Sequence, residues 1–123
     1  MKLRCAGDQI RIRVRKSDIE ALERDGQLTE TIALPEGGPF GFSIRLDGQA
    51  QQISVRQDGF LLTVSLPENQ ARQWINSEEV GMEAALPTIN QGLLQVAVEK
   101  DFPCQHQPTK NPEDTFGELL KDR

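Results

Sequence analysis

Two-residue alternation in one short segment constrains the fold most strongly. Residues 9–15 read Gln-Ile-Arg-Ile-Arg-Val-Arg, so apolar residues alternate with arginines. A period of two places successive side chains on opposite faces of a β-strand and does not fit the 3.6-residue period of a helix. The segment therefore predicts a strand with an apolar face toward a core and Arg11, Arg13 and Arg15 on the other face.

Turn residues divide most of the chain into eight strand-like segments. Asp58-Gly59 predicts a type I′ hairpin, because both central positions of that turn need a positive φ. Gly7-Asp8 and the Pro-Glu-Gly-Gly-Pro stretch at 35–39 separate other segments in the same way. The expected strands cover residues 2–6, 9–15, 28–34, 40–46, 52–57, 60–66, 80–86 and 92–99.

Two short helices are expected between these strands. Ser17 and Glu20 match a capping box, in which each side chain bonds the backbone N–H of the other residue. Gly26 suits the left-handed position that follows a helix. Pro67 suits the first turn of the second helix, with Ser65 as its cap.

The two halves of the chain repeat the same order of segments. Offsets of 50 and then 52 residues superimpose their apolar positions, and the second offset matches Ala-Leu-Pro at 33–35 with Ala-Leu-Pro at 85–87. This match predicts an internal duplication of a β-β-α-β-β unit, with pseudo-repeats at 2–46 and 52–99. Similar patterning without a shared origin is the alternative.

The expected architecture is one α+β domain over residues 1–103. Its eight mostly antiparallel strands are expected to form a barrel-like or strongly curved sheet with two short helices. A two-sheet sandwich or an open curved sheet is the alternative. Residues 104–123 read as a polar C-terminal tail with a short amphipathic turn that carries Phe116, Leu119 and Leu120.

The composition limits the function. The chain has 14 basic and 19 acidic residues and a net charge of −5, which argues against a general nucleic-acid binder. The sequence contains no signal peptide and no membrane-spanning stretch, so a cytosolic protein is expected. Cys5 and Cys104 are then reduced, semi-buried thiols. His106, near Cys104 in the tail, leaves too few ligands for a zinc site.

The arginine row supports two interpretations. Charged side chains on the outer face of a strand are most often plain solvated surface. Alternatively, neighbouring guanidinium groups hold phosphates or carboxylates through paired hydrogen bonds, and in a wide barrel they would line a tunnel. The candidate anion-binding residues are Arg11, Arg13, Arg15, Arg45 and Arg56.

Two carboxylates at the end of the last strand form a candidate metal site. Glu99 and Asp101 are two residues apart and share a face in an extended chain. Paired carboxylates hold Mg²⁺. The simpler interpretation is an exposed strand end with Lys100 between them.

Several short stretches carry a resemblance to known proteins. They are Lys-Leu-Arg at 2–4, Ile-Arg-Ile-Arg-Val at 10–14, Val-Ser-Leu-Pro at 64–67, and Val-Glu-Lys-Asp-Phe at 98–102 followed by Cys104. With these stretches, most of residues 1–104 resembles a small uncharacterised bacterial protein family, a domain of unknown function. This resemblance implies no activity and no site residues.

The repeated β-β-α-β-β plan is also similar in architecture to the CYTH-type triphosphate-tunnel proteins. That likeness implies an eight-stranded barrel that binds triphosphates through Arg, Lys and metal-binding Glu residues. Those enzymes open with a Glu-x-Glu-x-Lys strand, whereas residues 2–6 contain no acidic residue.

These features together predict a non-enzymatic cytosolic binding or interaction module. Its arginine row would bind a small anion or an acidic protein surface. The alternative is a metal-dependent phosphohydrolase of the triphosphate-tunnel type, with the arginines on phosphate and with Glu99 and Asp101 on Mg²⁺. No cofactor, nucleic acid or membrane partner is expected.

Overall fold

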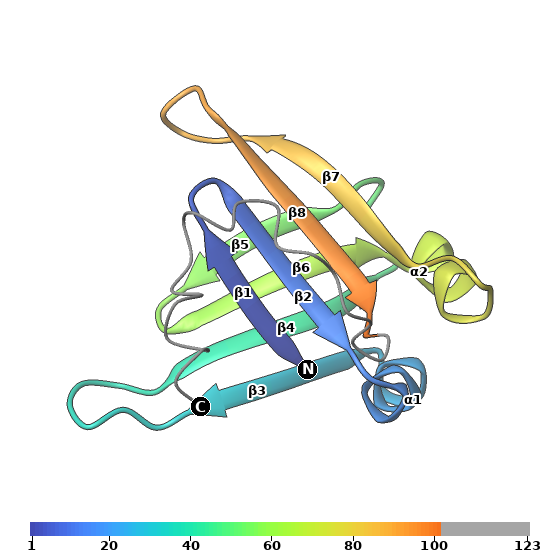
Figure 1. Cartoon of the computed structure of the whole chain (residues 1–123), viewed down its shortest axis with the longest axis horizontal. Coiled ribbons are helices and arrows are strands. Elements are labelled where there is room, and N and C mark those ends of the chain that lie inside the picture. Colours follow the sequence, from blue (N-terminus) through green and yellow to red (C-terminus); the bar gives the residue numbers. More distant parts are fainter. Residues whose placement is uncertain (102–123) are drawn as a thin grey trace, which may run out of the picture.

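The computed structural model describes residues 1–101, and the predicted tail at 104–123 lies outside these residues. Eight strands and two helices confirm the α+β class, and each strand lies within two residues of its predicted bounds (Figure 1). In chain order the elements are β1 (Lys2–Ala6), β2 (Gln9–Val14), α1 (Lys16–Asp25), β3 (Gln27–Ile32), β4 (Phe40–Asp47), β5 (Ser54–Asp58), β6 (Leu61–Pro67), α2 (Glu68–Ile75), β7 (Gly81–Pro87) and β8 (Leu93–Lys100).

The strands form two four-stranded sheets and do not close into the expected barrel. Sheet A has the order β1-β2-β8-β7, and sheet B has the order β3-β4-β6-β5. Four antiparallel hairpins confirm the mostly antiparallel character, while β2 with β8 and β4 with β6 are parallel. Each sheet thus joins one hairpin from each half of the chain. Within residues 1–101, each sheet therefore keeps two unpaired edge strands and does not close into a barrel.

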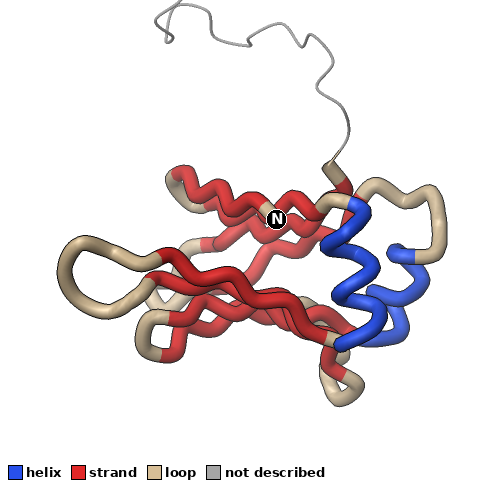
Figure 2. The backbone as a smooth tube through the Cα atoms, turned by 90° about the horizontal axis from the view of Figure 1, so that it is seen from below, coloured by secondary structure: helices blue, strands red, loops and turns tan. Residues whose placement is uncertain are grey.

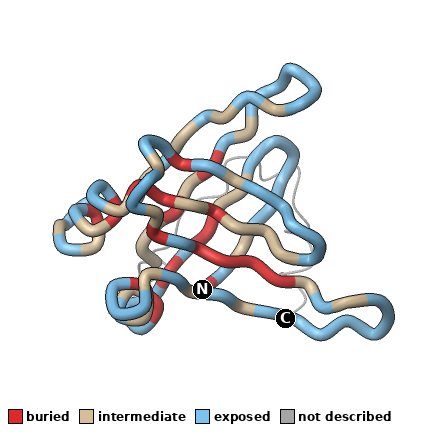
Figure 3. The backbone as a smooth tube through the Cα atoms, turned by 180° about the vertical axis from the view of Figure 1, so that it is seen from behind, coloured by how far each residue is buried: buried red, intermediate tan, exposed pale blue. Residues whose placement is uncertain are grey.

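The core lies between the apolar faces of the two sheets, which form two layers in Figure 2. The two-residue alternation seen in the sequence places these side chains inward, and Figure 3 shows the buried stretches in the middle strands. The helices α1 and α2 lie at one end of the sandwich (Figure 2). Leu22 of α1 and Trp74 of α2 are fully buried. The buried hydrophobic residues of the strands are Ile12, Val14, Phe42, Ile44, Leu46, Val64, Leu66, Val96 and Val98.

The helix ends differ from the sequence prediction at their first turns. The N-cap of α1 is Arg15, whose backbone N–H donates to Oδ2 of Asp18 at 2.8 Å, so the expected cap at Ser17 is wrong. Ser65 lies within β6 and does not cap α2. In both places the strand runs into its helix with at most one residue between, which leaves no loop for a separate cap. Gly26 ends α1 in the left-handed conformation, as predicted.

The hairpin at Asp58-Gly59 is confirmed, but its turn type differs. Asp58 pairs with Leu61, so the two turn residues are Gly59 and Phe60. Gly59 has a φ of 62°, and Gln91 is the only non-glycine residue with a positive φ in the described part of the chain. Glycine alone at the first turn position indicates a type II′ turn in place of the predicted type I′.

Candidate functional site

The first hairpin brings four basic side chains together on one surface. Its register sets Lys2 opposite Arg13 and Arg4 opposite Arg11. The intervening Ile12 is fully buried, so the four basic residues lie on the outer face of sheet A. We call this surface the basic patch; its members are Lys2, Arg4, Arg11 and Arg13.

One carboxylate lies within this basic patch. The parallel pairing of β2 with β8 sets Glu99 beside Arg13. Oε1 of Glu99 lies 3.2 Å from Nε of Arg11 and 3.9 Å from Nε of Arg13. This oxygen is buried and makes no hydrogen bond within the described residues. A single negative charge therefore faces two guanidinium groups.

The second candidate metal-binding carboxylate has a different neighbour. Oδ2 of Asp101 lies 3.7 Å from Nζ of Lys2, whose side chain is 73% exposed. Glu99 and Asp101 each face a basic side chain, and across residues 1–101 no three candidate ligands gather around a possible metal position. The carboxylates thus serve as partial counter-charges to the basic patch.

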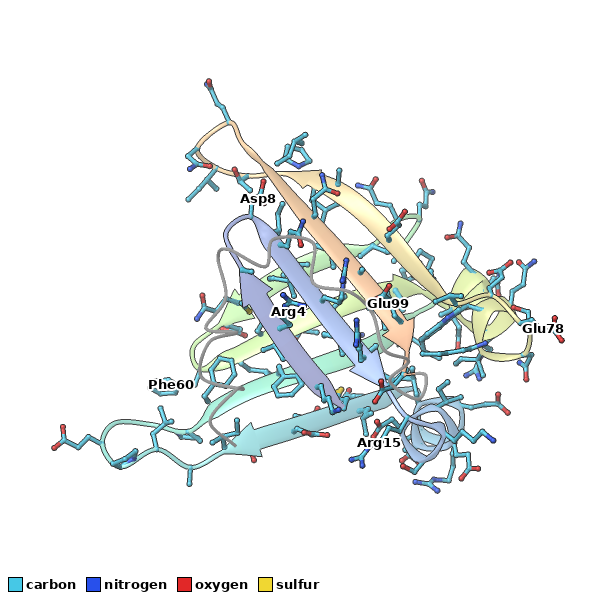
Figure 4. The ribbon with its side chains drawn as sticks, in the orientation of Figure 1. Arg4, Asp8, Arg15, Phe60, Glu78 and Glu99 are labelled. Carbon is cyan, nitrogen blue, oxygen red and sulfur yellow. The ribbon has the colours of Figure 1, made fainter. Side chains whose placement is uncertain are left out.

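The other three candidate anion-binding residues lie elsewhere. Arg15 stands at the start of α1, away from Arg4 on β1 (Figure 4). Arg45 of β4 and Arg56 of β5 are exposed residues of sheet B, whose outer face points away from sheet A. The structure therefore groups Arg11 and Arg13, places Arg45 and Arg56 on the other sheet, and leaves Arg15 at the helix start, beyond the pairing of β1 with β2.

The likeness to the triphosphate-tunnel proteins is not supported. In the described part of the chain the eight strands form two open sheets, so these strands make no single barrel that could enclose a ligand. Arg11 and Arg13 lie on the face opposite to the buried Ile12 and Val14. The arginine row therefore lines an outer surface, because the apolar residues of the same strand fill the core.

Sequence reasoning missed Lys2 and Arg4. The signal was present, because a two-residue turn at Gly7-Asp8 fixes the register of the hairpin on either side. That register makes Arg4 the partner of Arg11. Gly7 has a φ of 58°, as the first position of such a turn requires.

The outer face of sheet A is open and only shallowly hollowed. A depression of about 440 Å³ borders Arg11 and Ala97, and one of about 400 Å³ lies over Gly81 and Ala97. Both also border Glu83 of β7, so an acidic margin lies across the sheet from the basic patch. An open surface of this kind suits a macromolecular partner better than a small ligand, which needs enclosure.

The remaining sequence candidates add no chemistry to this surface. Cys5 is a free thiol and is exposed, in contrast to the semi-buried position expected for it. Cys104 and His106 lie outside the described residues. Neither helix within residues 1–101 has the length and apolar character needed to span a membrane.

Comparison with known proteins identifies a family and no activity. A family model described as "Family of unknown function (DUF7009)" matches residues 1–119. No curated protein and no solved structure matches the chain. The match covers all the described residues and continues well into the predicted tail.

Proposed function

Because the chain belongs to this family of unknown function, we propose a role from its own surface: a non-enzymatic interaction module that binds an acidic protein segment through the basic patch. The cytosol is part of the proposal. An exposed free thiol such as Cys5 fits a reducing compartment.

The opposed like charges of the basic patch are the observation that carries this proposal. Arg4 faces Arg11, and Lys2 faces Arg13, at directly opposed positions of one hairpin. Like charges at such positions destabilise a sheet. Glu99 offsets part of the charge of the two β2 arginines, but Arg4 has no acidic partner within the described residues. An acidic partner would remove this repulsion, and the release would favour binding.

The spacing of the charges fits an extended acidic segment. Opposed residues in a hairpin lie about 4.5–5.5 Å apart, and alternate residues of one strand lie about 7 Å apart. The four cations therefore form a small, flat grid, because both pairs stand on one open face. In an extended acidic peptide, every second carboxylate lies on the same face, and these carboxylates are also about 7 Å apart. They can therefore contact the four cations without being enclosed.

We also infer that the two halves of the chain arose by duplication. Gly7 and Gly59 open equivalent two-residue turns, at φ 58° and 62°, and lie 52 residues apart. That spacing differs by two residues from the first offset suggested by the sequence, and it leaves the inward phase unchanged because the strand period is two. The same spacing relates the buried Ile12 to the buried Val64.

A comparison of equivalent positions in the two sheets indicates that the basic patch belongs to sheet A alone. With the 52-residue spacing, the positions of Lys2, Arg4, Arg11 and Arg13 correspond to Ser54, Arg56, Thr63 and Ser65 of sheet B. Three of the four cations thus have hydroxyl residues as counterparts. The fold itself does not need these charges, which supports a binding role for them.

A titration followed by NMR tests the proposal. Uniformly ¹⁵N-labelled full-length protein receives an octaglutamate peptide, and a parallel sample receives inorganic tripolyphosphate. We expect peptide-induced shifts at Arg4, Arg11 and Arg13 that weaken toward 0.15 M salt, where the Debye length is about 8 Å. A stronger response to tripolyphosphate would favour a small anion. Shifts confined to sheet B, or none with either anion, would overturn the proposed site.

A further inference from the structure

The two ends of the sandwich are covered differently. At one end, α1 and α2 close the space between the sheets with fully buried Leu22, Ala71 and Trp74. At the other end, where the β3–β4 and β5–β6 connections lie, no element of residues 1–101 covers the inner faces (Figures 1 and 2). Phe60 lies at this uncovered end in Figure 4 and is 62% exposed.

Three apolar residues form a row across this uncovered end. Ile32 pairs with Phe40 across β3 and β4. The backbone N–H of Gly41 donates to the carbonyl of Phe60 at 2.9 Å, which sets Phe40 beside Phe60. We call Ile32, Phe40 and Phe60 the open-end patch. Phe40 is partly buried against the core, while Ile32 is 52% exposed.

The turn geometry does not explain an aromatic residue at position 60. Only Gly59 has the backbone conformation that its turn demands, and the second turn position takes polar residues readily. A side chain added at Gly38 would collide with the Phe60 ring, so the β3–β4 loop lies against that ring. The ring is thus held in place, yet most of it faces solvent. Covering such a ring would remove apolar surface from water, which is favourable.

The chain itself carries a segment with complementary chemistry. Twenty-two residues follow Asp101, and they include Phe116, Leu119 and Leu120. Spacings of three and four residues place these side chains on one face of a helical turn. The family match continues to residue 119, so the family pattern includes two of these three residues.

The connecting chain is long enough to reach the open-end patch. The backbone N–H of Asp101 donates to the carbonyl of Val14 at 2.8 Å, which fixes the point of departure beside β2. The 14 residues at 102–115 span up to about 45 Å when extended. A domain of this size has a radius of gyration of about 13 Å, so any part of its surface is within reach.

A second copy of the chain fits the open-end patch less well. A large apolar side chain buries about 150–250 Å² at most. Three such side chains together therefore bury less than the roughly 800 Å² per partner of a stable interface. An attached segment needs less area, because it is already held at a high effective concentration. The small size of the patch therefore favours an occupant from the same chain.

We propose that Phe116, Leu119 and Leu120 dock onto the open-end patch and cover the end of the sandwich that the helices leave open. This contact is independent of the proposed acidic partner, because it uses apolar side chains between the sheets. It gives the C-terminal segment a role in completing the core. The polar stretch before it then acts as a tether.

NMR of the full-length protein tests this contact. The F116S/L119S/L120S variant is compared with wild type and with a matched control, Q105S/Q107S/N111S, which changes three polar residues of the same segment. We expect the apolar triple variant to shift the Ile32 methyl and Phe60 amide signals, with loss of the contacts between the Phe116 ring and Ile32. The control should leave these signals in place. All substitutions lie beyond residue 101, so no residue of the two sheets or helices is changed.

A reciprocal variant completes the test. Phe60→Ser changes an exposed residue, and we expect it to move the amide signals of residues 113–120. Three outcomes would overturn the proposal: shifts confined to the tail, shifts at Arg4 and Arg11 alone, or a concentration-dependent dimer that Phe60→Ser abolishes. The second outcome would indicate an electrostatic contact of the acidic tail residues with the basic patch. The third would make a second copy the occupant.

Discussion

Arg4 and Arg11 stand directly opposite each other on β1 and β2, on the open face of sheet A. A sheet gains from opposite charges at such positions and loses from like charges. A substitution that relieves this repulsion should therefore raise the stability of the protein but weaken binding, because it also removes a binding charge. The fold also provides matched control positions for substitutions at this pair, such as Arg56 on β5.

Arg4→Glu should stabilise the protein while it weakens binding of the acidic peptide. The substitution converts a like-charge pair into an opposite-charge pair and should add about 0.2–1 kcal/mol to the free energy of unfolding. Urea unfolding at low salt measures this gain, which should shrink in 1 M NaCl. Arg56→Glu is the control, because Arg56 stands opposite the uncharged Thr63. An unchanged or lower stability of Arg4→Glu would contradict the repulsion.

Glu99→Gln should tighten binding of the acidic peptide. It removes the carboxylate that, among residues 1–101, faces both Arg11 and Arg13. A unit charge about 6 Å from a ligand charge contributes about 0.7 kcal/mol in water, so the Kd should fall about threefold. Fluorescence anisotropy with labelled octaglutamate measures the change. Glu83→Gln, across β8 from the basic patch, should have a smaller effect, and weaker binding by Glu99→Gln would be inconsistent with a site at this patch.

The ionisation of Asp18 should make the free energy of unfolding depend on pH. Burial raises the pKa of Asp18, but the Arg15 backbone N–H and the amino-terminal ammonium 3.1 Å away outweigh burial, so its pKa lies below the ordinary value. A lowered pKa in the folded state stabilises the protein above about pH 4, and this contribution is lost as the pH falls through the folded value. Asp18→Asn should therefore cost about 1–3 kcal/mol at pH 7 and less at pH 3.

Urea unfolding at the two pH values measures this difference for Asp18→Asn. Asp25→Asn serves as the control, because its exposed carboxylate pairs with the exposed Arg24 of the same helix end. A difference between wild type and Asp18→Asn that stays constant from pH 7 to pH 3 would show that the carboxylate charge is not the cause.

Gly26→Ala should destabilise the protein by about 1 kcal/mol. Gly26 ends α1 with a φ of 73°, and its N–H donates to the carbonyl of Leu22 at 2.8 Å. Gly26→Asn should cost less, because asparagine tolerates this conformation better. Gly48→Ala is the control, since its φ is not positive and an added Cβ would meet only the flexible end of Glu68. Equal thermal midpoints for the alanine variants at the two positions would contradict the strain.

Local sequence patterns predicted the strands and helices, because the formation of these elements depends mainly on residues that are close in the sequence. Alternation in residues 9–15 gave the inward phase of β2, and the glycine at 26 gave the end of α1. The pairing of Ile12 with Val98 joins strands far apart in the sequence, and no local pattern contains it. For the same reason the two-sheet arrangement remained only an alternative to the barrel.

The candidate site could be predicted only in part. The alternation identified Arg11 and Arg13 as outer-face residues, and the short turn before them was enough to add Arg4. The alternation of polar and apolar residues also selected Arg45 and Arg56. This alternation shows on which face of its sheet a residue lies, but it does not show to which sheet the strand belongs. Their place on sheet B depends on the long-range pairing of β4 with β6.

The central claim is that the basic patch binds an acidic partner, and two charge-matched double variants test it most directly. R4E/R11E alters the patch, and R45E/R56E alters sheet B, and each lowers the net charge from −5 by four units. The measurement is the Kd for labelled octaglutamate at fixed low salt. We predict a loss of at least tenfold for R4E/R11E and a change within about threefold for R45E/R56E. Equal losses for the two variants would show that only the overall charge matters, and would contradict a site on sheet A.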